Sequence, residues 1–362
     1  MVKMAKKSIL LVTTQSEGIS ASEIRMRYFR QSLENHGYKV VNYEINLSGL
    51  KRYLSYFYRS PPSGLITASK DVDLILATSP TLINAILGYK TAKRLRLPLV
   101  VDIRDIWEEY AKTAHSLMYS VGVIERIVAE YYEALNYASK IFVVTEPMKQ
   151  YYQKILGFGN KVIVVSNGAD VDIIKCDGIV KREEDLVCLV DLNRPYHNLE
   201  FLFAALKSND LRLTVVGGGS YMTTMQRIAQ NLEIEDRVSF VGWVPYEKLA
   251  VYLCRAKVGV VGRPFIANTE YLYTIPVKTY DYLAAGLSVA GYGPENSTLE
   301  KFILENNVGA YVGQSNPEIF SDVLVRLVTE HDKYRERARS LAVIFDRKKL
   351  AKKMVEIIDE LI

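Results

Sequence analysis

Short apolar runs alternate with longer amphipathic segments along most of the chain. SILLVTT (residues 8–14) has the length of a buried strand, ASEIRMRYFRQSLENHG (21–37) has helical spacing with a glycine where a C-terminal cap belongs, and YKVVNYEI (38–45) is again a strand. The same unit repeats between DLILATS (73–79) and KVIVVSNG (161–168). Strand alternating with helix predicts an α/β fold with a parallel, doubly wound sheet.

The polar segment KCDGIVKREED (175–185) interrupts this alternation, which resumes at LVCLV (186–190) and continues to LSVAGYG (287–293). The remainder, to Ile362, has the pattern of helix. We therefore expect a first domain at 1–174, a linker at 175–185 and a second domain at 186–362, with the last helix free to pack back on the first domain. Two such domains would place a ligand cleft at the carboxyl ends of both sheets.

Length and composition agree with two globular domains. The chain has 362 residues, 49% of them hydrophobic and 24% charged, which excludes a disordered or fibrous protein. The net charge of +5 is uneven, because residues 1–170 hold 22 Lys and Arg against 15 Asp and Glu, and the rest holds 24 against 26. An acidic partner or an anionic membrane for the first half, and scattered solvated charge, are both consistent with this asymmetry. A nucleic-acid partner is not expected.

The three cysteines, Cys176, Cys188 and Cys254, have spacings that match neither a metal site nor a disulfide framework. We expect them to be free thiols in a reducing compartment. The apolar run SILLV is too short for a signal peptide, and no window holds the 18 or so apolar residues of a membrane span. These features predict a cytoplasmic chain and leave open peripheral attachment to the cytoplasmic face of a membrane.

One segment bears on the membrane question. KRYLSYFYRSPPSGL, Lys51 to Leu65, mixes three basic residues with four aromatic ones. This mixture suits a bilayer interface or the headgroup of a polyprenyl phosphate. It equally suits a half-buried helix, so the segment has two interpretations.

The segment PVKTYDYLAAG (276–286) carries the clearest chemical signal. Pro276 suits the first turn of a helix, whose amides lack partners and attract anions. A lysine at such a position, Lys278, is electrostatically misplaced unless something negative binds there or the lysine is simply solvated. Asp281 lies one turn later on the same face, where it could pair with Lys278 or accept a hydrogen bond from a sugar hydroxyl. We therefore predict an anion site at Lys278.

Two other kinds of site are not predicted. GGGS (217–220) does not complete the pattern G-x-G-x-x-G of dinucleotide sites, because Tyr221 and Met222 follow it. No Asp-x-Asp pair stands at a strand end in the second half, so we do not expect the activity to require a metal.

Five segments are informative when they are taken in order. They are ATSPTLINAILGYKTAKRLRLPLVVDIRDIWEE (77–109), NYASKIFVVTEPMKQYYQKILGFGNKVIVVSNGADVD (136–172), LTVVGGGS (213–220), RVSFVGWVPYEKLAVYLCRAKVGVV (237–261) and PVKTYDYLAAGLSVAGYG (276–293). Together they resemble the GT-B glycosyltransferases of family 4, in the branch that assembles surface polysaccharides and lipid-linked glycans. The resemblance implies two Rossmann-like domains. It also implies retaining transfer of a hexose from a nucleoside diphosphate sugar, a UDP-sugar or GDP-sugar, held by the second domain, to a glycan or polyprenyl-linked acceptor held by the first.

The resemblance assigns roles to residues of the second half. Lys278 matches a basic residue at the donor diphosphate, and Asp281 stands where the family usually has a ribose-binding glutamate. The family's other glutamate is replaced by Tyr273. In VDLNRPYHNLEFL (190–202) Arg194 would also grip the diphosphate, whereas His197 is either a partial substitute for the family's lysine or a polar loop residue.

The resemblance also assigns backbone and aromatic contacts. Gly217 and Gly218 would give the donor room, and Trp243 would contact the nucleobase or be a core or lid aromatic. In the first half Gly18 would let a phosphate approach the backbone. Arg25 would reach an acceptor phosphate or be a surface charge.

Asp105 completes the predicted catalytic set, with Lys278 and Arg194. It follows the strand LPLVVDI and would contact the transferred sugar or the acceptor hydroxyl. A catalytically silent subunit that binds sugar nucleotides or glycans stays an alternative because of Tyr273. A GT-B sugar-nucleotide epimerase is a weaker alternative, because the four histidines form no cluster in the sequence.

Overall fold

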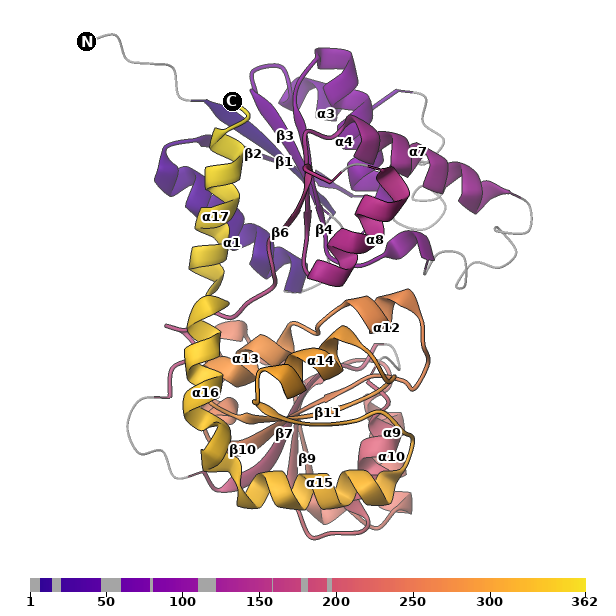
Figure 1. The fold of residues 1–362 in the computed structure, drawn as a ribbon, viewed down its shortest axis with the longest axis vertical. Coiled ribbons are helices and arrows are strands. Elements are labelled where there is room, and N and C mark those ends of the chain that lie inside the picture. The colour runs from indigo at the N-terminus through magenta and orange to yellow at the C-terminus, as the bar shows by residue number, and fades with distance from the viewer. Residues whose placement is uncertain are drawn as a thin grey trace. The chain divides into compact units, whose positions relative to one another are not determined.

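A computed structural model describes residues 7–14, 21–46, 60–78, 81–109, 122–157, 159–176, 182–193 and 197–362. Its contacts divide the chain into two compact units, residues 1–166 with 348–362, and residues 167–347. Each unit contains one six-stranded sheet whose strands pair in parallel, so the α/β prediction is confirmed (Figure 1).

The first unit has the strand order β2-β1-β3-β4-β5-β6. The strands β1, β3 and β4 are buried along nearly all of their length, which explains why the sequence shows them as continuous apolar runs. The strands are β1 (Ser8–Thr14), β2 (Lys39–Ile45), β3 (Leu74–Thr78), β4 (Leu99–Ile103), β5 (Lys140–Val143) and β6 (Val162–Val164). The helices are α1 (Ala21–His36), α3 (Ser63–Ala68), α4 (Leu82–Leu95), α7 (Val123–Tyr137), α8 (Glu146–Leu156) and α17 (Arg347–Asp359), of which the first residue, Arg347, belongs to the second unit.

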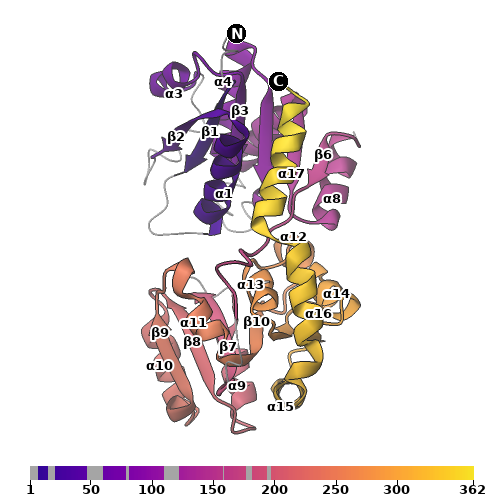
Figure 2. The same ribbon diagram turned by 90° about the vertical axis from the view of Figure 1, so that its left-hand side faces the viewer.

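The C-terminal helix α17 completes the core of the first unit. Its buried residues Met354, Val355 and Ile358 belong to one apolar cluster with Phe29 and Leu33 of α1 and with residues of the sheet. Both views show α17 beside α1 (Figures 1 and 2). At its end, the Asp359 carboxylate lies 2.7 Å from Nε2 of His36. The last residues of the chain are therefore part of the first unit's core.

The second unit has the strand order β12-β11-β10-β7-β8-β9. The strands are β7 (Glu184–Asp191), β8 (Leu213–Gly218), β9 (Val238–Gly242), β10 (Ala256–Gly262), β11 (Ser288–Tyr292) and β12 (Gly309–Val312). The helices are α9 (Leu199–Leu206), α10 (Met222–Asn231), α11 (Ala250–Leu253), α12 (Thr269–Tyr273), α13 (Lys278–Ala284), α14 (Thr298–Glu305), α15 (Pro317–Thr329) and α16 (His331–Ile344). Short 3-10 turns cover Glu235–Arg237 and Tyr246–Lys248.

The strand β12 corrects the sequence analysis, which read everything after residue 293 as helix. It has four residues, GAYV, and pairs in parallel with β11 at the edge of the sheet. Its residues are alternately half-buried and buried, so it lacks the continuous apolar run that marks the central strands. A strand this short between two helices gives too little pattern to be recognised.

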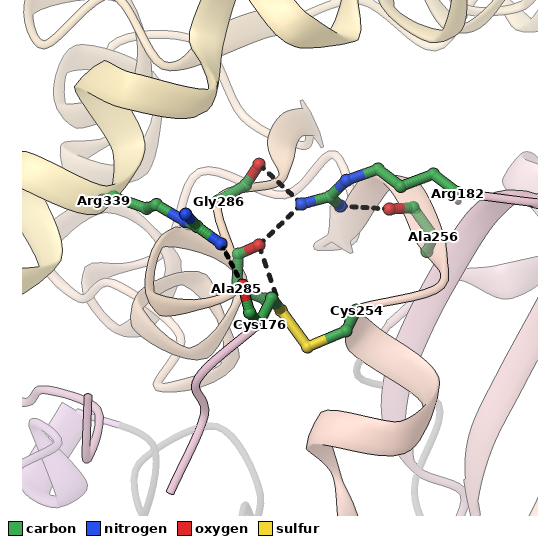
Figure 3. Close-up of a disulfide and its surroundings, with 7 residues drawn as sticks. All are labelled: Cys176, Arg182, Cys254, Ala256, Ala285, Gly286 and Arg339. Carbon is green, nitrogen blue, oxygen red and sulfur yellow. Dashed lines mark hydrogen bonds between the residues drawn. A yellow bond between two sulfur atoms is a disulfide. The ribbon is translucent and has the colours of Figure 1, made fainter. Parts of the chain in front are cut away.

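The cysteines give a second correction. Cys176 and Cys254 form a disulfide with their Cα atoms 5.4 Å apart, although 78 positions separate them in the sequence (Figure 3). The expectation of three free thiols is wrong for this pair, and only Cys188, buried in β7, is free. Spacing in the sequence could not reveal the pair, because the fold brings Cys176 beside the end of α11. Arg339 donates to the Cys176 carbonyl at 2.8 Å, and Arg182 donates to the Ala285 carbonyl at 2.7 Å (Figure 3).

The membrane segment is described only in part. Residues 51–59 of Lys51 to Leu65 lie outside the described residues. Leu65, in α3, is fully buried. Within the described ranges no helix is both long and apolar enough to cross a membrane. Both interpretations of the segment stay predictions.

Candidate functional site

The strand order of the second sheet reverses between β7 and β10. From β7 the chain proceeds to β8 and β9 on one side, whereas β10, β11 and β12 follow on the other side. Ligands of open parallel sheets bind outside the carboxyl ends of the strands at such a switch point. The carboxyl ends of β7 and β10 therefore mark the candidate site.

Lys278, the first residue of α13, reaches this point. Its Nζ donates to the carbonyl of Leu189 in β7 and lies 3.3 Å from Nδ1 of His197. No carboxylate of the described residues lies within ion-pair distance of the ammonium group. Burial is the main cause that lowers the pKa of Lys278 to about 8, and the charge of Arg263 also lowers it. The structure thus holds a half-buried cation where the sequence predicted an anion site.

His197 lies beside Lys278. The sequence alone leaves two interpretations of His197, a partial substitute for the family's lysine and a polar loop residue. Its Nε2 accepts the backbone N–H of Asp191 at 3.2 Å, and its carbonyl accepts the hydroxyl of Tyr292 at 2.7 Å. Burial, followed by the charges of Lys278 and Arg263, lowers the pKa of His197 well below its ordinary value. The imidazole is therefore neutral near pH 7, and it adds polarity to the site without adding charge.

Asp281 forms its ion pair with Arg347 and none with Lys278. The residue is 4% exposed, and Oδ1 accepts the Tyr246 hydroxyl at 3.0 Å and lies 3.6 Å from Nη2 of Arg347. Burial raises the pKa of Asp281 to about 6, while the Arg347 charge opposes that shift. Tyr246 in turn accepts the backbone N–H of Asp170 at 3.1 Å. In this structure the carboxylate ties α13 to two other segments of the unit, and its contact with a donor ribose stays a prediction.

The two glycines at the end of β8 differ in how closely the protein packs around them. Gly217 has φ of +130°, and a Cβ there would lie 1.8 Å from the carbonyl oxygen of Val190 in the neighbouring strand. At Gly218 a Cβ would lie 3.2 Å from the indole of Trp243, which is 62% exposed. Gly217 is therefore needed for packing with or without a donor, whereas Gly218 is buried beneath the exposed indole of Trp243.

This difference gives a paired test. Gly217→Ala is expected to lower the free energy of unfolding by about 3 kcal/mol, because backbone must move to admit the methyl group. Gly218→Ala should cost less than about 1 kcal/mol, because the exposed indole of Trp243 can shift aside. Urea unfolding followed by circular dichroism measures both, and equal stabilities of the two variants would contradict the packing argument.

The first unit places its predicted residues differently. Asp105 follows β4 by two residues and is partly exposed, consistent with a role toward a ligand. Arg25 is 7% exposed and forms a bidentate pair with the fully buried Asp102, at 2.8 and 3.1 Å. It also donates to the carbonyls of Val165 and Ser166. The expectation that Arg25 is a surface charge is wrong, because the residue is buried and its N–H groups bind partners inside the first unit. Its contact with an acceptor phosphate stays a prediction.

Two predicted residues cannot be placed. Gly18 and Arg194 lie outside the described residues, so their roles stay predictions. The part of the chain that the structure describes contains no group of three or more His, Cys, Asp or Glu side chains arranged to hold a metal ion.

The sequence analysis missed Arg263. It directly follows β10, and its charge lowers the pKa of both Lys278 and His197. The signal was present in KVGVVGRPF, where a basic residue stands at the carboxyl end of a buried strand.

Comparisons with known proteins agree with the fold. Residues 177–342 match the model of the family described as glycosyl transferases group 1. A sucrose-phosphate synthase from Thermosynechococcus elongatus superposes with a TM-score of 0.76 at 16% identity, over 98% of this chain and 99% of that chain. The chain has the GT-B fold. This fold and the group 1 match together support a glycosyltransferase.

Other GT-B structures are similar over their whole length. Anabaena HepE in complex with UDP-glucose has a TM-score of 0.72 at 14% identity, over 98% of this chain and 100% of that chain. The lipopolysaccharide outer core galactosyltransferase WaaB has a TM-score of 0.66 at 12% identity, with coverage of 98% and 100%. No curated protein matches the sequence.

Proposed function

We propose that this chain is a retaining glycosyltransferase of family 4 that transfers a hexose from a UDP-sugar to a glycan or lipid-linked acceptor. The second unit would bind the donor, and the first would bind the acceptor, with Asp105 on the acceptor side. The observation that carries the proposal is the half-buried Lys278 ammonium at the switch point of the second sheet, with no ion-pair partner among the described residues.

This placement suits the chemistry of sugar transfer from a diphosphate. As the bond between sugar and phosphate breaks, negative charge gathers on the leaving diphosphate and positive charge on the sugar ring. A fixed cation at the diphosphate therefore stabilises the transition state more than the ground state. Lys278 is held for this role by its bond to the Leu189 carbonyl.

The choice of UDP is supported by structural neighbours. HepE was solved with UDP and with UDP-glucose, and this chain shares its GT-B fold over 98% of its own length. A glycan acceptor is consistent with the galactosyltransferase WaaB. Contact with an anionic membrane would accompany a lipid-linked acceptor and belongs to the same proposal.

The first test is a thermal-shift screen against UDP, GDP, ADP and dTDP, with and without Mg²⁺. A ligand at 100 times its dissociation constant stabilises the folded chain by about 2.7 kcal/mol, so UDP should raise the melting temperature measurably. Slow hydrolysis of UDP-sugars without acceptor should follow, and proton NMR of the first sugar released should show the anomer of the donor. Binding of UDP with no hydrolysis or transfer would favour a silent binding subunit, and no binding of any nucleotide would contradict the proposal.

A further inference from the structure

Arg263 lies at the carboxyl end of β10, the strand that pairs with β7 at the switch point. It is the first residue after β10, and its backbone N–H donates to the Tyr292 carbonyl at the end of β11 at 2.9 Å. Two adjacent strands therefore fix its backbone at the edge of the sheet where ligands bind.

The guanidinium group of Arg263 makes only weak contacts with the described residues. Its Nη2 donates weakly to the Thr274 hydroxyl at 3.4 Å, and its central carbon lies 5.1 Å from the centre of the Tyr271 ring. The Nε atom is buried and has no hydrogen-bond partner among the described residues. Within the described ranges, Arg263 forms no ion pair. Most of its hydrogen-bonding capacity is thus unused by the protein.

The charge of Arg263 acts on the two polar side chains that meet at the switch point. After burial, it is a further cause that lowers the pKa of Lys278 and of His197, whereas Cys188, Asp191 and Asp281 raise the pKa of Lys278. Arg263 follows β10, Lys278 binds a carbonyl of the paired strand β7, and neither cation has an ion-pair partner among the described residues. Two such cations repel one another unless an anion lies between them. Cations at the carboxyl ends of neighbouring strands are the arrangement expected for binding a ligand with more than one negative charge.

We propose that Arg263 is a second contact of the donor diphosphate, binding it through two guanidinium N–H groups while Lys278 binds it as a point charge. This inference rests on the proposed function, because it names a further residue of the same donor site. A planar guanidinium matches phosphate oxygens in pairs, which an ammonium group cannot do. The two residues reach the diphosphate from different elements, β10 and α13. Together they would also neutralise the charge that develops on the leaving group.

Titration of UDP by calorimetry at pH 7 tests this assignment with two variants at opposite ends of β10. Arg263→Gln is expected to weaken UDP binding by about 10- to 100-fold, because it removes charge-assisted hydrogen bonds. Arg255 immediately precedes β10 and pairs with Glu183 and Glu184. Arg255→Gln is therefore the matched control and should bind UDP within about twofold of wild type.

The outcomes separate this inference from the proposed function. Tight UDP binding by wild type and equal binding by Arg263→Gln overturns the inference and leaves the glycosyltransferase proposal intact. Failure of wild type to bind any nucleoside diphosphate overturns both. If Arg263→Gln does not fold, Arg263→Lys decides, since it keeps the charge and lacks the paired N–H groups. A loss of about fivefold or more then supports the contact, and unchanged affinity overturns it.

Discussion

Lys278→Ala is expected to lower kcat/KM for the sugar donor by at least about 10- to 100-fold. A charge-assisted hydrogen bond contributes about 1.5 to 3 kcal/mol, and about 1.4 kcal/mol corresponds to a factor of ten. The effect should appear in kcat as well as in donor affinity, because the leaving diphosphate carries more charge in the transition state. Steady-state kinetics with UDP-sugars measures it. Lys301, exposed on α14, offers a control, and Lys301→Ala should behave as wild type.

The pH dependence gives a second readout of the same residue. Because the pKa of Lys278 is lowered to about 8, the free protein loses this positive charge as the pH rises through that value. Wild-type affinity for UDP should therefore fall between about pH 7 and 9, and the Lys278→Ala variant should lack this fall. Wild-type kinetics in Lys278→Ala, or an identical pH profile, would contradict the assignment of Lys278 to the diphosphate.

Reduction of the Cys176–Cys254 disulfide is expected to lower the free energy of unfolding by up to about 4 kcal/mol. The bond joins residues 78 positions apart, and a crosslink that closes a long loop restricts the unfolded chain strongly. It also holds Cys176, whose carbonyl Arg339 binds, near the carboxyl end of α13. Chemical unfolding with and without a thiol reductant measures the difference.

The variant Cys254→Ser supplies the control for this prediction. It cannot form the bond, so its stability should equal that of reduced wild type and should not respond to reductant. Thiol titration of the unfolded chain under each condition shows whether the bond was present. Equal stability of the oxidised and reduced wild type, with the bond confirmed in the first, would contradict the prediction.

Much of the fold could be predicted because central parallel strands are buried on both faces. Such strands, β1, β3 and β10 among them, appear in the sequence as unbroken apolar runs between amphipathic helices. The edge strand β12 has no such run, and the disulfide joins residues whose proximity only the folded chain creates. The features that could not be predicted are therefore those that depend on contacts between residues far apart in the sequence.

The residues of the candidate site also differ in whether the sequence could predict their positions. Lys278 could be found because its charge conflicts with its place at a helix start, which is a local feature. The position of His197 beside it could not be predicted, because the two residues are 81 positions apart in the sequence. Asp281 and Arg25 look like ligand-binding groups in the sequence, yet each binds a charged partner inside its own unit. A charged residue's type and position do not show whether its partner is a ligand or the protein.

The place of α17 affects the order in which the protein can fold during synthesis. Residues 348–362 belong to the first unit, and Met354, Val355 and Ile358 fill its core beside α1. These residues leave the ribosome after the whole of the second unit. The first unit therefore stays incomplete until the second unit has been synthesised. During that time the apolar surface that α17 will cover is exposed to water. Removal of residues 348–362 would leave that surface exposed, so the stability of the first unit depends on the C-terminal helix.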